Sequence, residues 1–194
     1  MAPEVNNWRE LLVNHVLGGW NLQTISYFGT GQYFSPSFST IDPSNTNTQG
    51  GLPDRIADGN KPGDQRAFNQ WFDPSAFKIP GCPDSKPVCS ASERQNVGRY
   101  GNSGANFLEG QGVNAHHLSV AKSFPLTERF KMTLTGEISN LFNHPHFDTT
   151  LNNNSGIQRN ISNPDPGKYT VIVPNFNPEK QSYRQVAVKM RIEF

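Results

Sequence analysis

The sequence contains no apolar run approaching the roughly 20 residues that a membrane-spanning helix requires. Met1 is also not followed by the positively charged and then apolar segment that marks a secretory signal peptide. We therefore expect neither a transmembrane helix nor a signal peptide in this chain. Neither absence excludes strands that cross a membrane, because alternating strands have mediocre hydropathy and escape a search for helices.

An excess of charge of one sign is missing too. The 17 Lys and Arg residues nearly balance the 16 Asp and Glu residues, the formal net charge is +1, and the basic residues are scattered. A nucleic-acid-binding surface requires a basic patch, so we expect no nucleic-acid partner. No serine lies in a nucleophile-elbow context and no paired carboxylates stand out. The sequence therefore predicts no enzymatic activity, no cofactor and no metal.

Cysteine is scarce, and the two residues present lie close together in the proline-rich stretch "CPDSKPVC" as Cys82 and Cys89. A structural zinc site requires four ligands, and no partner pair is apparent. Such a spacing favours a disulfide that staples a surface loop, provided that the compartment is oxidising. Cys82 and Cys89 are thus a possible disulfide.

Aromatic residues are plentiful in a chain that is otherwise polar. Hydrophobic residues make up 34% and the mean hydropathy is −0.62, yet 13 residues are Phe and aromatics reach 11%. A disordered chain is poor in aromatics, so this composition indicates a folded protein.

Apolar and polar residues alternate strictly along the last stretch, "YRQVAVKMRIEF". Successive side chains of a strand point to opposite faces, which predicts a terminal strand with Val186, Val188, Met190, Ile192 and Phe194 on one face and Lys189, Arg191 and Glu193 on the other. The stretches 116–124 and 128–142 alternate in the same way, and Lys131 and Glu137 lie on the polar side of the second stretch. Residues 8–17 and 20–30 are predicted as two strands paired across Gly18 and Gly19, with a helix as the competing interpretation of 8–17.

Two long polar segments separate these strands, at 35–112 and at 144–168, whereas "PLT" at 125–127 is a short turn. A structureless loop as long as the first segment is uncommon in a compact domain, so it is either functional or evidence against a simple soluble fold. We interpret its carboxylates, Asp54, Asp58, Asp64 and Asp73, as solvated loop charges rather than calcium ligands. Short turns on one side and long loops on the other are typical of outer-membrane barrels.

The stretches "GGWNLQTISYFGTGQYFSP", "LPDRI", "WFDPSAFKIP" and "GRYGNSGANFLEGQGVNAHHLSVAKSFPLTERFKMTLTGEISNLFNHPHF" together resemble the C-terminal end of Oar-like TonB-dependent receptors of the Acidobacteria type. The resemblance covers nearly the whole chain and keeps the order of the motifs. It implies a plugged outer-membrane barrel of about 22 strands, energised through TonB, that takes up a substrate. Residues 1–194 then correspond to the last six or so strands: a pair at 8–34, strands at 113–143 and terminal strands at 169–194.

The expected fold class is therefore all-β, the antiparallel strands of a partial transmembrane β-barrel with long polar loops. A sheet of this size cannot close around such a lumen, so we expect a fragment that is inactive alone. The expected partners are outer-membrane lipid, the barrel-assembly machinery, and TonB only through a plug that this chain lacks. The resembled assembly signal usually has a polar residue and a glycine where this sequence has Ala187 and Lys189, which weakens the match.

The barrel interpretation assigns roles to particular side chains. The apolar residues of the terminal strand face lipid and close the barrel, and Lys131, Glu137, Lys189, Arg191 and Glu193 line the lumen. Aromatics near strand ends form girdles at the membrane interfaces, and the candidates are Trp8, Trp20, Tyr27, Phe28, Tyr33, Phe34 and Phe142. His144 and His146 are interpreted as residues of a turn at Pro145, and His116 and His117 as neighbours on opposite faces of a strand.

Two alternatives remain from the sequence. A soluble, secreted β-sandwich that binds a carbohydrate or a protein predicts that the apolar faces of the strands converge on a dry core between two sheets. A barrel segment instead leaves these faces exposed as one patch, larger than a soluble monomer normally shows. A secreted hydrolase requires a pocket with convergent titratable groups, for which the sequence offers no candidate.

Overall fold

The computed structural model describes residues 15–39, 41–147, 156–170 and 182–194, and these form two units. The described residues of the first unit are 15–28, 113–145 and 182–194, and those of the second are 29–39, 41–112, 146–147 and 156–170. Within these ranges, no helix has the length and apolar character needed to cross a membrane. Each unit is built differently.

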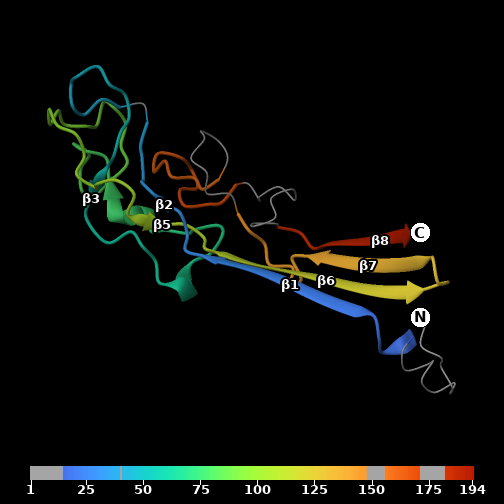
Figure 1. Cartoon of the computed structure of the whole chain (residues 1–194). Helices are drawn as coiled ribbons and strands as arrows, with labels where there is room; N and C mark the ends of the chain where they lie inside the picture. Colours follow the sequence, from blue (N-terminus) through green and yellow to red (C-terminus); the bar gives the residue numbers. More distant parts are fainter. Residues whose placement is uncertain (1–14, 40, 148–155, 171–181) are drawn as a thin grey trace. The chain divides into compact units, whose positions relative to one another are not determined.

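A four-stranded sheet forms the first unit, in the spatial order β1-β6-β7-β8 (Figure 1). Its strands are β1 (Trp20–Gly29), β6 (Val113–Pro125), β7 (Lys131–Ser139) and β8 (Gln185–Glu193). Both β6–β7 and β7–β8 pair antiparallel. The expected fold class, an all-β antiparallel partial barrel, is confirmed: the sheet is open, with β1 and β8 as its edge strands among the described residues.

The register of the sheet decides which side chains share a face. Leu118 pairs with Ile138 in β6–β7, and Leu134 pairs with Met190 in β7–β8. Directly paired residues lie on the same face of a sheet and alternate with residues of the other face. All even-numbered residues of β6, β7 and β8 therefore share one face, and all odd-numbered residues share the other.

A tight turn joins β6 to β7. The backbone N–H groups of Leu126 and Thr127 donate to the Phe130 carbonyl at 2.9 and 3.2 Å. The Thr127 hydroxyl accepts from the N–H of Phe130 at 3.1 Å. A short turn of this kind fixes the register of the hairpin that it closes. The strand predicted at 128–142 is shorter in the structure, because β7 ends before Asn140, whose φ of 51° takes the chain out of the extended conformation.

Most of the strand predicted at 8–17, and with it the pairing predicted across Gly18 and Gly19, lies outside the described residues. His15 and Val16 form a helical turn, and residues 8–14 lie outside the described part of the chain. The ammonium group of Lys122 donates to the carbonyls of Val16 and Gly18 at 2.9 and 2.7 Å, which holds the turn against β6. The strand expected at 20–30 is β1, and its described neighbour in the sheet is β6.

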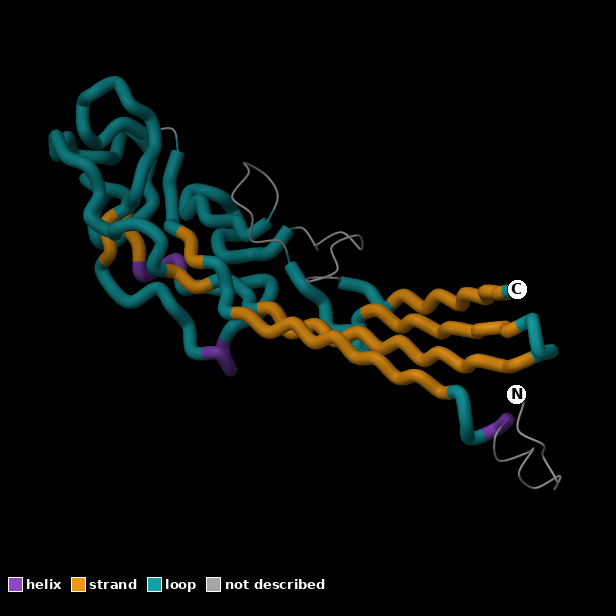
Figure 2. The backbone as a smooth tube through the Cα atoms, in the orientation of Figure 1, coloured by secondary structure: helices purple, strands orange, loops and turns teal. Residues whose placement is uncertain are grey.

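The second unit consists mainly of loop, as Figure 2 shows, and it is nevertheless packed. Its short elements are β2 (Tyr33–Phe34) paired with β5 (Leu108–Glu109), β3 (Asp54–Arg55) paired with β4 (Phe77–Lys78), and the 3₁₀ turns η1 (Gly63–Gln65) and η2 (Pro74–Ala76). Its buried core comprises Phe34, Phe38, Ile41, Phe72, Ala76, Phe77, Ile79, Cys82, Cys89, Leu108, Ile157, Ile161 and Tyr169. The apolar residues that come singly in the sequence thus gather in one place.

Both long polar segments contribute to this core. Phe68 and Trp71 of the first segment contact Tyr169, the residue directly after the second segment, with ring centroids 6.5 and 5.1 Å apart. Phe147 lies 4.0 Å from Phe68, centroid to centroid. Burial raises the pKa of Tyr169 to about 12, while its hydroxyl accepts from the N–H of Gln111 at 2.9 Å. The second segment therefore completes the core of the first.

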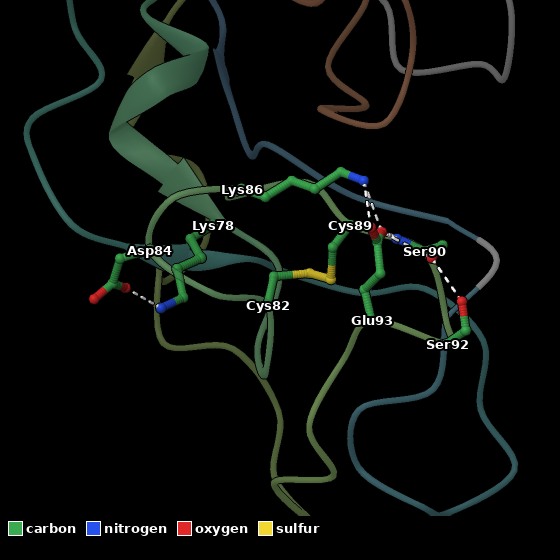
Figure 3. The surroundings of a disulfide bond; sticks show 8 residues. All are labelled: Lys78, Cys82, Asp84, Lys86, Cys89, Ser90, Ser92 and Glu93. Carbon is green, nitrogen blue, oxygen red and sulfur yellow. Dashed lines mark hydrogen bonds and ion pairs between the residues drawn. A yellow bond between two sulfur atoms is a disulfide. The ribbon is translucent and has the colours of Figure 1, made fainter.

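A disulfide joins Cys82 to Cys89, both of which are buried (Figure 3). Charged pairs surround it: Lys78 pairs with Asp84, and Lys86 pairs with Glu93 at 2.7 Å. Hydrogen bonds from Lys86 and Ser90 lower the pKa of Glu93 to about 2. The stretch is therefore fixed covalently at its core and by ion pairs at its surface.

Candidate functional site

The even-numbered face of the sheet is apolar and uncovered. On β8 it carries Val186, Val188, Met190 and Ile192, all more than half exposed, and Val188 is 71% exposed. Phe194, the even-numbered residue directly after β8, is 97% exposed. Leu22 of β1 is 68% exposed. Exposed apolar patches of this extent mark a surface that contacts another apolar phase or partner.

Aromatic rings lie near both ends of this face. Trp20 begins β1, and Phe130 and Phe194 contact each other beside the β6–β7 turn, with ring centroids 6.4 Å apart. At the other end, Phe28 and Phe142 contact the His116 ring at 5.2 and 5.0 Å. Trp20 and Phe28 are eight residue-to-residue steps of ~3.4 Å apart, which gives about 20 Å of height for a strand tilted by ~40° and comes close to the ~25 Å apolar band of a barrel.

Other predicted interface aromatics have different places. Phe34 is fully buried in the core of the second unit, so the interface role predicted for it is wrong. Tyr27 contacts His117 at 5.8 Å, which puts it on the face opposite to Phe28. Tyr33 is 52% exposed in β2 of the second unit, and Trp8 lies outside the described residues.

One lysine lies on the apolar face. Lys122 pairs with Leu134 and is only 6% exposed. Its ammonium nitrogen lies 4.7 Å from the centroid of the Trp20 ring, in addition to its two carbonyl acceptors. A buried ammonium is costly unless its donors are satisfied. The helical turn at Val16 therefore makes this charge compatible with an apolar face.

The odd-numbered face is polar and carries the residues predicted to line a lumen. Lys189 and Glu137 form an ion pair, with Nζ 2.6 Å from Oε2, across β7 and β8. Arg191 and Glu193 pair at 3.1 Å along β8, and Lys131 lies directly opposite Glu193. Hydroxyl groups continue this face, since the Ser123 and Thr133 oxygens are 3.1 Å apart. Opposite charges on paired strands stabilise each other modestly when they are exposed.

The histidines have separate places in the described part of the chain. His116 contacts Phe28 and His117 contacts Tyr27, so the two rings lie on opposite faces. His144 is held in the turn after β7, where its backbone N–H donates to the Asn140 side-chain oxygen at 2.9 Å. His146 is buried at 2% exposure. Within the described ranges no group of three or more His, Cys, Asp or Glu side chains could hold a metal ion.

Two carboxylates of the first long segment, those of Asp54 and Asp42, accept hydrogen bonds from neighbouring groups. Asp54 is only 7% exposed and accepts two hydrogen bonds from the Arg99 guanidinium, at 2.7 and 2.8 Å, which raises the pKa of Arg99. Asp42 accepts from the Ser44 hydroxyl and from the N–H groups of Ser44 and Asn47, and these bonds lower its pKa. The expectation of a solvated loop charge is therefore wrong for Asp54. Its partner lies 45 positions away, so no local signal in the sequence reveals it.

Residues 4–186 match the family model described as an outer membrane beta barrel domain. No curated protein and no solved structure matches the chain significantly.

Proposed function

The chain belongs to the outer membrane beta barrel domain family, and from this premise we propose that it is part of the barrel of a TonB-dependent receptor of the Oar-like type. Its location is the outer membrane, in keeping with the family. In this proposal the complete receptor takes up a substrate across that membrane. Uptake of this kind requires no catalytic residue or cofactor.

The observation that carries the proposal is the difference between the two faces of the sheet. The even-numbered face is apolar and exposed, and the odd-numbered face carries the Lys189–Glu137 pair. A barrel wall requires this arrangement, with an apolar exterior toward lipid and a polar interior. The β-sandwich alternative requires the apolar faces to be buried against a second sheet, whereas the apolar side chains of β8, and Leu22 and Phe28 of β1, are exposed.

Closure of the barrel requires strands in addition to the described ones. The outer edges of β1 and β8 would leave backbone groups unsatisfied in lipid. In our proposal, strands of the same receptor pair with both edges, so that the described sheet alone has no uptake activity. The barrel-assembly machinery recognises β8 with its terminal Phe194, and TonB acts on a plug that contacts Lys189 and its neighbours.

The barrel-wall assignment is tested with Met190→Cys and Lys189→Cys, which change neighbouring residues on opposite faces. The two native cysteines form the disulfide, so the introduced thiol is the only one that reacts with an environment-sensitive dye. In phospholipid vesicles we expect nitroxide-labelled lipid to quench the dye at position 190 strongly and the dye at position 189 weakly. Equal quenching at the two positions would contradict the assignment.

Transport is tested separately, in cells that produce the complete receptor. We expect uptake of a panel of labelled peptides and iron chelates to include at least one solute that is accumulated only when TonB is present. Deletion of residues 185–194 should abolish that accumulation together with the receptor's outer-membrane level. If uptake of every solute tested were the same with and without TonB, the receptor proposal would be wrong while the barrel assignment would stand.

A further inference from the structure

A chain of two hydrogen bonds links three side chains of β1 and β6. The Ser26 hydroxyl oxygen lies 2.8 Å from Nδ1 of His116, and Nε2 of the same ring lies 2.8 Å from Oδ1 of Asn114. Ser26 and His116 are 90 positions apart in the sequence and come together only because β1 lies beside β6. A nucleophile, a base and a group that orients the base, each within hydrogen-bond reach of the next, are the signature of nucleophilic catalysis.

The two contacts are compatible with one tautomer of a neutral His116 ring. In this tautomer Nε2 of His116 carries the proton and donates it to Asn114 Oδ1, which as an amide oxygen can only accept. Nδ1 of the neutral ring is then the acceptor, and the Ser26 hydroxyl donates to it. His116 is thereby held in the tautomer in which it can take the proton of Ser26, as the third member of a triad requires.

The surroundings indicate the substrate. His116 and Asn114 are even-numbered and lie on the apolar face, and the His116 ring is flanked by Phe28 and Phe142. Both Phe rings and the Ser26 side chain are exposed. Ser26 lies near the end of β1, at the level of the second aromatic row, where an outer-membrane strand meets the polar ester region of the lipids. An acyl chain can lie along the apolar face while its ester carbonyl reaches Ser26.

We propose that Ser26, His116 and Asn114 form a nucleophilic site that cleaves acyl esters of membrane lipids. Ser26 Oγ forms a bond to the ester carbonyl carbon while its proton passes to Nδ1 of His116. The ester C–O bond then breaks, and the proton passes from His116 to the leaving alcohol. Water, deprotonated by His116, next cleaves the acyl–Ser26 bond and releases a carboxylic acid. Ser26 and His116 are the catalytic residues, and Asn114 is a positioning residue.

Slow turnover is expected. Ser26 is exposed, so water rather than aimed donors stabilises the developing oxyanion, and removal of one aimed donor from a hydrolase costs about 10²–10³ in kcat. Covalent capture of the nucleophile is therefore a better readout than product release. The inference rests on the membrane location of the apolar face and is independent of transport.

The experiment uses the complete receptor that contains this chain, reconstituted into phosphatidylethanolamine–phosphatidylglycerol vesicles and treated with a long-chain alkyl fluorophosphonate, because the sheet alone leaves its edges unpaired in lipid. Capture forms a bond from Ser26 Oγ to phosphorus, releases fluoride and sends the proton through His116 to water. We expect mass spectrometry to locate the added group on Ser26. His116→Gln should slow capture by about 10²–10⁴-fold, the usual contribution of a general base.

Asn114 is tested by rescue. We expect Asn114→Leu to slow capture by about 10- to 100-fold, the effect of one orienting hydrogen bond, and Asn114→Asp to restore most of the rate. A purely structural role would not distinguish these two variants in this way. Ser123→Ala is the matched control, because it removes a hydrogen-bonded hydroxyl of the odd-numbered face and should leave capture unchanged.

Several outcomes would overturn the inference. Capture at other serines in place of Ser26 would show that Ser26 is not activated. Equal capture rates for the wild-type chain and the His116→Gln variant would show the same. Capture of a short-chain reagent in detergent but of no long-chain reagent in vesicles would disprove the assignment to lipid esters. Ser26→Ala should leave TonB-dependent uptake unchanged, so this result and the transport result can fail independently.

Discussion

The two units of this chain place their apolar residues in opposite ways. The sheet keeps Val186, Val188 and Met190 exposed on one face. The loop unit buries Phe34, Phe72 and Phe77 in a core of its own. The loop unit therefore follows the rule for folding in water, whereas the sheet follows the rule for a wall between lipid and a wet lumen. Changes in one unit should thus have effects that depend on the solvent around it.

The largest effect is expected from Phe77→Ala. Phe77 is fully buried and its ring contacts Phe72 at 6.0 Å, so truncation leaves a cavity and should lower the stability of the loop unit by about 3–5 kcal/mol. Exchange of the backbone amide hydrogen should accelerate at Leu108 and remain unchanged in β7. Phe28→Ala is the control, because the exposed Phe28 ring should leave exchange in the loop unit unchanged. A uniform acceleration across both units would show that they do not fold separately.

A charge on the apolar face should have the next largest effect. Val188→Arg is expected to cost about 2–4 kcal/mol in a bilayer, the range for a cation on the lipid side of a barrel, and almost nothing in water. Ala187→Arg is the matched control, because Ala187 pairs directly with Glu137 on the polar face. Urea-driven equilibrium unfolding from vesicles measures both variants. Equal losses of unfolding free energy for Ala187→Arg and Val188→Arg would show that the two faces of β8 do not differ in their contact with lipid.

Replacing both cysteines by serine should destabilise the loop unit by about 2–3 kcal/mol, because the disulfide closes a short loop that the unfolded chain would otherwise explore freely. Proteolysis between Cys82 and Cys89 should become faster, while the proteolytic resistance of the sheet should not change. Reduction of the wild-type chain should reproduce the effect. If the serine variant resisted protease as well as the wild type, the loop unit would be held by its core and ion pairs alone.

The smallest effect concerns alkaline pH. The folded pKa of Tyr169 is about 12, raised from 10.0 by burial, so folding favours the neutral phenol. The stabilisation that the buried neutral phenol of Tyr169 contributes to the free energy of unfolding is complete below pH 10. Between pH 10 and 12 it is lost, and the loss is about 1–2 kcal/mol after allowance for residual solvation. Tyr169→Phe should remove this dependence, although it also loses the hydrogen bond from Gln111. Thermal unfolding of the loop unit at pH 8 and 11.5 measures the difference.

Much of the sheet follows from alternation. The predicted terminal strand corresponds to β8, and the stretch predicted at 116–124 lies within β6. Alternation depends only on neighbouring residues, so it can be recognised in the sequence of any strand that has one apolar and one polar face. The helical turn at His15 and Val16 could not be predicted in this way, because Lys122 holds it from more than a hundred positions away.

The loop unit was the less predictable region. Its apolar residues come singly between Pro, Gly, Asn and Asp, and no periodicity marks a core. What joins them is packing between segments far apart in the chain, such as Phe68 against Phe147. The Ser26–His116 contact was missed for the same reason, since only the pairing of β1 with β6 creates it.

The sequence by itself determined the two faces of each long strand, because a period of two needs no knowledge of the partner strand. Only the tertiary structure decided that the polar segments share a core, that Asp54 is paired with Arg99, and that Lys122 is buried on an apolar face. These features depend on distances between residues that are remote in the chain. The chain entropy lost in bringing such residues together is offset by the apolar area and the hydrogen bonds that they gain.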